Sequence, residues 1–178
     1  MILELIVLRI VIYFVPTENQ HLAKSFRILL RVPVPWVYVG VYLIGVLLEY
    51  LLPLNLVPRG AFNAIEIAGG LLFLAGAVIA GISLYRFYKA RTTTTPGEVS
   101  KELVTDGFYK YTRNPMYVGL ALAYLGEAGL LVQIWPLFLL PLLIAYVNAV
   151  VIPLEESRLT AEFGEVYRQY QSKVRRWF

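Results

Sequence analysis

Residues 116–152 read MYVGLALAYLGEAGLLVQIWPLFLLPLLIAYVNAVVI, a nearly continuous apolar run in which Glu127 is the only charged side chain. A helix needs about 20 apolar residues to cross a bilayer, so this run is long enough for two spans, residues 116–132 and 135–152. Only Gln133 and Ile134 separate them. We therefore predict a tight antiparallel hairpin, whose open end brings the residues before position 116 beside those after position 152.

Two further apolar runs, residues 34–53 and 62–84, are also long enough to span a membrane. The chain of 178 residues is 58% hydrophobic, with a mean hydropathy of +0.64. Because a backbone in lipid must satisfy its own hydrogen bonds, these long continuous runs indicate helices rather than barrel strands. We expect an all-α, polytopic membrane bundle with four spans, a cytoplasmic loop and a C-terminal amphipathic helix.

A shorter apolar run, residues 1–15, carries Glu4 and Arg9. It is interpreted as a short N-terminal membrane helix, either a fifth, tilted span or a helix lying in the interface. It lacks the basic start and the Ala-x-Ala-like site of a signal peptide, so we expect it to remain in the mature protein.

The basic residues predict the orientation of the bundle. Of the 16 Lys and Arg residues, all except Arg9 and Arg59 lie in segments 17–33, 85–115 and 153–178, which four spans place on one side. By the positive-inside rule that side is cytoplasmic. The net charge of +4 is then explained by topology and by attraction to anionic lipids, so no nucleic-acid partner is required. The chain has no cysteine and a single histidine, His21, so we expect no disulfide, no thiolate chemistry and no metal centre.

A polar, aromatic stretch, GFYKYTRNPMYVG at residues 107–119, leads directly into the hairpin. Pro115 marks where the helix begins, because proline is tolerated in a first turn but not in a helix interior. The hairpin returns the chain to the same end, where Glu155 and Glu156 follow the last span. The two segments are therefore expected to meet in space.

This expected meeting point combines tyrosine faces, an amide, cations and two carboxylates. Such a set suits a soluble cationic cofactor that meets a lipid-soluble substrate, because a sulfonium favours aromatic faces and nearby carboxylates. An interfacial aromatic belt beside a solvated acidic turn is the alternative explanation. The residues concerned are Lys101, Tyr109, Tyr111, Arg113, Asn114, Tyr117, Glu155 and Glu156.

The tail beyond Glu155 is predicted to form an amphipathic helix packed on the membrane surface or on the preceding loop. Its apolar positions recur at helical spacing, and Arg175-Arg176-Trp177-Phe178 is typical of an interfacial anchor. The apolar positions are Leu159, Phe163, Val166, Tyr167 and Tyr170.

Over residues 91–177 the chain also resembles a known family. The motifs are LVTDGFY at 103–109, RNPMYVG at 113–119, the pair Glu155-Glu156, and Phe163-Gly164 followed by Tyr167 and Tyr170. In this order and at these spacings they are similar to the membrane methyltransferases typified by isoprenylcysteine carboxyl methyltransferase and the phospholipid methyltransferases.

The resemblance implies transfer of a methyl group from S-adenosylmethionine to a lipid or prenylcysteine-like acceptor at the cytoplasmic membrane face. It implies one domain over residues 1–178, with N-terminal helices in 1–90 and the cofactor-binding catalytic region in 91–178. Glu156 is the candidate base and Arg113 the candidate catalytic cation, although a helix-start carboxylate and an interfacial arginine would also explain them. By position, the cofactor-binding residues correspond to Thr94, Lys101, Glu102, Leu103, Val104, Tyr109, Asn114, Pro115, Met116, Tyr117 and Glu155.

Two positions depart from the prenylcysteine enzymes that this part of the chain resembles. Asn114 stands where they carry histidine, so a titrating role there is not expected. Val151 aligns with the arginine that serves the substrate carboxylate, and valine cannot pair with an anion. The methyl acceptor therefore stays open, and a non-catalytic lipid-binding or assembly protein that keeps the fold is the alternative function.

Overall fold

The computed structural model describes residues 33–54, 56–91 and 103–178, and every regular element within them is helical. The expected all-α fold is therefore confirmed for these residues, whereas the expected helix at residues 1–15 lies outside them. In chain order the elements are α3 (Val34–Leu51), η1 (Arg59–Ala61), α4 (Phe62–Arg91), η2 (Gly107–Lys110), α5 (Pro115–Leu130), α6 (Trp135–Tyr146), η3 (Val147–Val151), α7 (Ile152–Phe163) and α8 (Glu165–Lys173).

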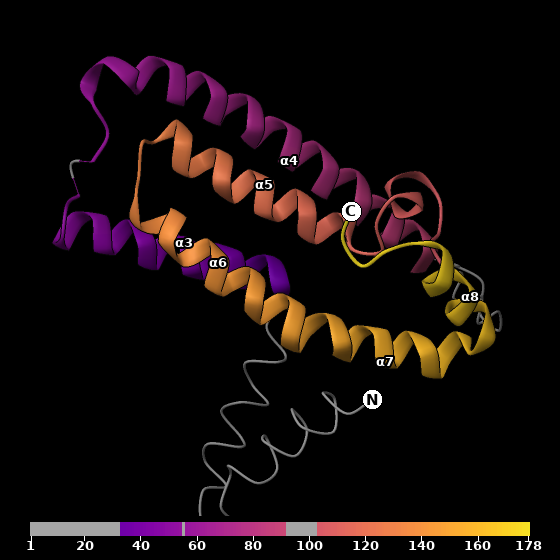
Figure 1. Cartoon of the computed structure of the whole chain (residues 1–178). Helices are drawn as coiled ribbons and strands as arrows, with labels where there is room; N and C mark the ends of the chain where they lie inside the picture. The colour runs from indigo at the N-terminus through magenta and orange to yellow at the C-terminus, as the bar shows by residue number, and fades with distance from the viewer. Residues whose placement is uncertain (1–32, 55, 92–102) are drawn as a thin grey trace, which may run out of the picture.

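The predicted hairpin is present: α5 and α6 run antiparallel and are joined by a turn of four residues, 131–134 (Figure 1). The backbone N–H of Gln133, in this turn, donates to the carbonyl of Ala128 in α5 at 2.8 Å. Pro115 and Pro136 lie in the first turns of α5 and α6, where a missing N–H leaves no helical bond unmade.

Glu49, near the end of α3, fixes this turn from the neighbouring helix. Its Oε2 accepts hydrogen bonds from the backbone N–H groups of Ile134 at 2.9 Å and Trp135 at 3.1 Å. A carboxylate at this place satisfies otherwise unpaired donors and faces the positive end of the α6 dipole. This pairing helps to hold α3 alongside α6 (Figure 1).

Glycines set the spacing between α4 and α5. A Cβ added at Gly76 would lie 2.3 Å from the backbone N of Ala123, and one at Gly126 would lie 2.2 Å from that of Phe73. The two backbones approach so closely that only glycine fits at these contacts. Glycines of both helices thus let α4 and α5 pack at close distance.

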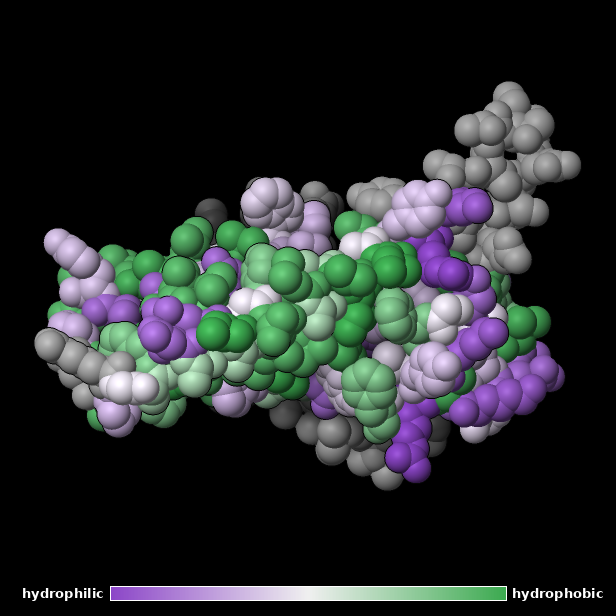
Figure 2. Space-filling view, turned by 90° about the horizontal axis from the view of Figure 1, so that it is seen from above, coloured by the Kyte–Doolittle hydropathy of each residue, from purple (hydrophilic) through white to green (hydrophobic). Residues whose placement is uncertain are grey.

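Three helices in the described part of the chain are long and apolar enough to cross a membrane: Val34–Leu51, Phe62–Arg86 and Trp135–Phe163. The fourth expected span is α5, which has 16 residues, fewer than the roughly 20 that one crossing needs. Figure 2 shows apolar side chains over the middle of the helical body and polar ones at both ends, most strongly at the end where α7 and α8 lie.

The last span continues beyond its expected end at Ile152, because α6, η3 and α7 form one continuous helix to Phe163. Residues 147–151 are π-helical, and Pro153 follows in the first turns of α7. A proline in a helix removes one backbone hydrogen bond and clashes with the carbonyl four residues earlier. A wider π turn immediately before it relieves this conflict and lets the helix continue.

The amphipathic tail is two helices rather than the single helix that we expected. Gly164 separates α7 from α8 and adopts φ 55°, a conformation that glycine enters without the penalty of a Cβ. The chain turns there, and α8 with the following residues returns toward the start of α5 (Figure 1). Tyr167 is the buried residue of α8.

Candidate active site

The polar stretch before the hairpin folds as the short turn η2 followed by the start of α5. Asp106 precedes η2 and pairs with Arg86 at the end of α4. Gly107 has φ 60° and its missing Cβ would lie 3.0 Å from the guanidinium of Arg86. The turn is thus tied to α4 on one side, and it delivers Tyr109 and the residues that follow it to the end of the hairpin.

Arg113 connects this stretch to the C-terminal tail. Its Nη1 donates to the carbonyls of Gln171 at 3.0 Å and Val174 at 3.3 Å, which are orphan acceptors at and just beyond the end of α8. Its backbone N–H donates to the carbonyl of Arg175 at 2.9 Å. A guanidinium at a helix C-terminus also faces the negative end of the dipole. Arg113 therefore holds α8 and the tail against the polar stretch that precedes α5.

Glu156 lies between two guanidinium groups. Its Oε1 is 2.7 Å from Nη2 of Arg113, and its Oε2 is 2.6 Å from Nη2 of Arg176. The Nε of Arg176 also donates to Oε1 at 3.2 Å. Only 15% of the Glu156 side chain and 12% of the Arg113 side chain are exposed, so these charge-assisted bonds are largely shielded from water.

This geometry bears on the catalytic roles predicted for Glu156 and Arg113. A general base needs an oxygen that can receive the proton of the reacting group. Both carboxylate oxygens of Glu156 already accept from arginines, and the Arg113 guanidinium is shared between Glu156 and the tail carbonyls. The contacts favour structural roles, and the catalytic roles stay predictions.

Glu155 interacts with two tyrosines of the site, Tyr117 and Tyr109. The hydroxyl of Tyr117 donates to its Oε1 at 2.6 Å, which joins α5 to α7 across the open end of the hairpin. Burial first, and then the charge of Glu155, raise the pKa of Tyr109 to about 12. The Tyr170 hydroxyl in turn donates to the carbonyl of Tyr109 at 2.7 Å. Glu155, Tyr117 and Tyr109, predicted separately from the sequence, are thus brought together.

Asn114 precedes α5 and also binds the tail. Its side-chain Nδ2 donates to the carbonyl of Arg176 at 2.8 Å, and the Thr112 hydroxyl donates to the same carbonyl at 2.9 Å. Pro115 is buried, and Met116 packs against the buried core cluster. These residues connect the motif to the interior of the bundle.

The other predicted cofactor residues lie in the segment before η2 or outside the described residues. Leu103 and Val104 are partly buried in the non-helical segment before η2. Thr94, Lys101 and Glu102 lie outside the described residues.

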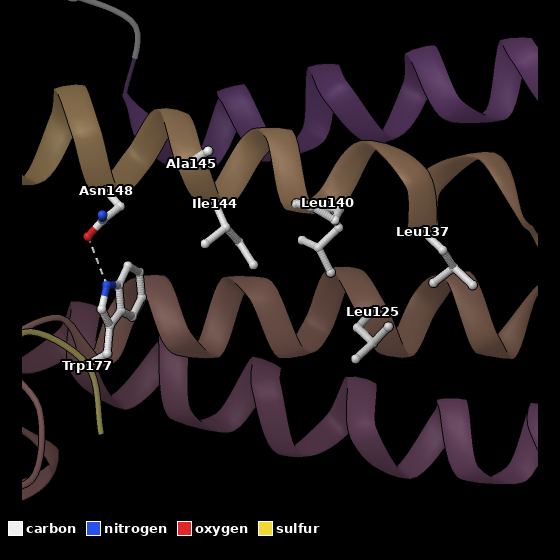
Figure 3. Close-up of a pocket in the computed structure, with 8 residues that line it drawn as sticks. Leu125, Leu137, Leu140, Ile144, Ala145, Asn148 and Trp177 are labelled. Carbon is white, nitrogen blue, oxygen red and sulfur yellow. Dashed lines mark hydrogen bonds between the residues drawn. The ribbon is translucent and has the colours of Figure 1, made fainter.

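An apolar groove of about 650 Å³ lies between α5 and α6 and ends beside the tail (Figure 3). Asn148, in the π-helical segment, forms its polar end. The indole Nε1 of Trp177 donates to Asn148 Oδ1 at 3.0 Å. Besides these two residues, the groove is lined by Leu125, Leu137, Leu140, Pro141, Ile144 and Ala145.

Comparison with known proteins places the chain in a family. A model of the family described as phospholipid methyltransferase matches residues 65–166, more than half of the chain. The chain belongs to the phospholipid methyltransferase family. The protein-S-isoprenylcysteine O-methyltransferase of Schizosaccharomyces pombe is 40% identical over 72 residues, which cover 40% of this chain and 30% of that relative. The chain thus matches less than a third of this curated relative, and no solved structure matches the chain.

The phospholipid methyltransferase match begins in α4 and ends in α8. It includes the Tyr117–Glu155 and Arg113–Glu156 contacts but stops before Arg176, which completes the ion-pair cluster. Membership in this family of S-adenosylmethionine-dependent membrane methyltransferases confirms the resemblance detected in the sequence.

Three residues at the site are not predicted from the sequence to be functional. Residues 175–178 are typical of an interfacial anchor, yet Arg176 and Trp177 hydrogen-bond to Glu156 and Asn148. Asn148 carried a usable signal, because it is the only amide in the apolar run 135–152, and polar residues inside such runs commonly mark function. No local sequence pattern predicts the contacts of Arg176, because its partners lie 20 and 28 residues away.

Proposed function

We propose that this protein transfers a methyl group from S-adenosylmethionine to a lipophilic acceptor, a lipid or a prenylcysteine-like molecule, at the cytoplasmic membrane face. One observation carries the proposal. The Glu155–Tyr117 bond of 2.6 Å joins two segments of the family match at the polar end of an apolar hairpin. Water-side and lipid-side reactants can meet only at such a boundary.

The residues around Glu155 fit a sulfonium cofactor chemically. Glu155 is exposed although it binds Tyr117, so a carboxylate stands at the surface beside aromatic rings. A cation is attracted both by a carboxylate and by the faces of such rings. We propose that Tyr109, Tyr117 and Glu155 form the centre of the cofactor site. Its outer parts would be Thr94, Lys101, Glu102, Leu103, Val104, Asn114, Pro115 and Met116.

S-adenosylmethionine supplies a methyl group that is already activated by the positive sulfur. The protein then has mainly to position the reactants and to exclude water. Arg113 and Glu156 serve this purpose in our proposal, because their contacts hold α8 and the tail against the motif. They act as positioning residues, and no base is required unless the acceptor must lose a proton.

We propose a topology in which α5 crosses the membrane as a fourth span. Its 16 residues rise about 24 Å, and it lies along the spanning helix α4 throughout the glycine contacts. The distribution of Lys and Arg supports a cytoplasmic site. We further propose that residues 1–178 act as one domain, with cofactor binding in residues 91–178.

The groove between α5 and α6 supports a lipophilic acceptor. Its walls are apolar side chains of the two hairpin helices, and it ends near Arg176, whose Nη1 lies 3.5 Å from Asn148 Oδ1. An apolar chain in this groove would have its head at the polar end of the bundle.

Calorimetric titrations of S-adenosylmethionine and of S-adenosylhomocysteine, whose sulfur is uncharged, into detergent-purified protein test the cofactor site. We expect saturable binding of both. Glu155→Gln should weaken binding of the positively charged S-adenosylmethionine at least tenfold and that of S-adenosylhomocysteine less, whereas Glu165→Gln, whose exposed carboxylate pairs with Arg168 in α8, should change neither. If the wild-type protein bound no S-adenosylhomocysteine, the non-catalytic lipid-binding or assembly function would be favoured.

Incubation with isotopically labelled S-adenosylmethionine and membrane lipid extract, followed by mass spectrometry, tests the acceptor class. We expect label in the lipid fraction. Label confined to water-soluble products would contradict a lipophilic acceptor.

A further inference from the structure

The indole of Trp177 closes the polar end of the apolar groove. Figure 3 shows the ring beside the α5–α6 hairpin, pointing its nitrogen at Asn148. From Leu137 to Asn148 the lining side chains of α6 and η3 extend over about 16 Å of helical rise. Toward α7 the groove ends at Trp177.

Asn148 is the residue that holds this indole. It is the only amide in the apolar run 135–152, and it lies in the π-helical segment, a feature that occurs often at functional sites. Its Oδ1 accepts from Trp177 Nε1 at 3.0 Å and faces Nη1 of Arg176 at 3.5 Å. A polar side chain among apolar neighbours is costly unless paired, so this bond fixes the orientation of the ring.

The backbone of the tail is fixed from the opposite side. The carbonyl of Arg176 accepts from the Thr112 hydroxyl and from Nδ2 of Asn114, and the carbonyl of Arg175 accepts from the N–H of Arg113. Trp177 is therefore held both through its side chain and through the residues directly before it. Its indole is a wall with a defined position rather than a loose anchor at the interface.

We propose that Trp177 is a specificity-determining residue: it ends the groove in which the apolar chain of the methyl acceptor lies, and Asn148 locks it in place. The proposal rests on the proposed function for the identity of the occupant. One apolar chain suits the groove, because its lining is apolar except at the Asn148 end and its volume of about 650 Å³ is that of a small-molecule site. The wall fixes how far a chain can advance toward α7.

Native mass spectrometry with lysophosphatidylcholines of increasing chain length tests this proposal without enzymatic turnover. The wild-type protein, presented with an equimolar mixture, should retain one adduct with a preferred chain length. Trp177→Ala should shift the preference to longer chains, because the groove then continues toward α7. The matched control is Trp36→Ala, an exposed residue of α3, which should leave the preference unchanged.

Two further variants keep the test decisive if Trp177→Ala does not fold. Trp177→Phe keeps an aromatic ring but cannot donate to Asn148, and Asn148→Ala removes the acceptor. Both should broaden the range of chain lengths. The same wild-type preference in all three variants would overturn the proposal.

The location of the chain is tested by a pair of alanines in the same continuous helix. Ala145 lines the groove, whereas the exposed Ala149 does not. Ala145→Leu should reduce the lipid adduct several-fold and Ala149→Leu should leave it intact. Equal adducts in the two variants would contradict the groove as the site.

The outcomes also separate this inference from the proposed function. Lipid adducts that depend on Trp177, in a protein that binds no S-adenosylhomocysteine, would leave the groove valid and refute methyl transfer. Binding of S-adenosylhomocysteine together with lipid adducts that do not depend on Trp177 would support the cofactor site and refute the groove.

Discussion

The Oε2 of Glu156 lies 2.6 Å from Nη2 of Arg176, 20 residues further along the chain. The other oxygen of the same carboxylate lies 2.7 Å from Nη2 of Arg113, 43 residues earlier. One carboxylate thus joins α7, the start of α5 and the tail. Its removal would leave two guanidinium groups facing each other in a poorly hydrated place.

Replacement of Glu156 by glutamine should therefore lower stability. We expect a loss of about 3 kcal/mol in the free energy of unfolding. The range for hydrogen bonds to charged groups, about 1.5–3 kcal/mol, meets there the range for a buried pair that loses one partner, about 3–5 kcal/mol. Thermal unfolding in detergent measures the effect. Glu165→Gln, which breaks an exposed pair with Arg168, should change stability by less than about 0.5 kcal/mol. An equal effect of the two substitutions would argue against the arginine cluster.

The glycine contacts between α4 and α5 predict that two alanine substitutions in α4 differ in their effect on stability. Gly76→Ala would place a Cβ 2.3 Å from the backbone N of Ala123, which forces the helices apart at a cost of about 1–3 kcal/mol. Gly81→Ala in the same helix meets nothing within 4 Å, and alanine is the better helix former, so it should be neutral or stabilising. Thermal unfolding of the two variants distinguishes the contact from a general effect of alanine.

Docking of the tail and binding of S-adenosylhomocysteine should depend on the hydrogen bond that the Asn114 side chain donates. Asn114→Asp replaces the Nδ2 donor with a carboxylate oxygen that would face the Arg176 carbonyl, 2.8 Å from the amide nitrogen. Two acceptors repel, so the tail should detach and S-adenosylhomocysteine should bind at least tenfold more weakly. Asn114→Ala removes the bond without repulsion and should have a smaller effect in calorimetry. Binding that is weaker in Asn114→Ala than in Asn114→Asp would contradict this role.

Tyr109, which is partly buried, and Tyr167, which is buried, should make the protein less stable in alkali. Burial, followed by the charge of Glu155, raises the pKa of Tyr109 from 10.0 to about 12, and burial is also the main reason why the pKa of Tyr167 is raised to about 12. The unfolded chain then loses these protons at lower pH than the folded chain. The stabilising contribution is complete below pH 10.0 and is lost as the pH rises toward about 12.

Unfolding midpoints recorded across this pH range measure the effect. Tyr109→Phe should make the decline shallower, because it removes one of the protons involved. Tyr111→Phe is the matched control, since that side chain is 70% exposed, and the decline should persist. A decline that is identical in wild type and Tyr109→Phe would contradict a contribution from this residue.

Local sequence patterns were sufficient for the hairpin and for one part of the site. The apolar run 116–152 and its short interruption predict two antiparallel helices, and this topology requires residues near 117 and 155 to meet. The bond between Tyr117 and Glu155 is therefore a direct consequence of span length and turn length.

The length of the last helix could not be inferred from hydropathy. The apolar run ends near Ile152, where Pro153 follows, and a proline usually marks a boundary. The π-helical segment at 147–151 absorbs the proline, so the helix continues to Phe163. Whether a backbone widens at a proline depends on its packing, which a periodic pattern does not contain.

By itself, the sequence determined the apolar helices, the hairpin and the family motifs, because these follow from local composition and spacing. Only the tertiary structure decided that the chain turns at Gly164 and that Arg176 and Trp177 reach Glu156 and Asn148. The physical reason is that a reversal and a shared carboxylate depend on how segments 20 or more residues apart pack together. Contacts of this kind produce no periodic pattern in the sequence from which they could be predicted.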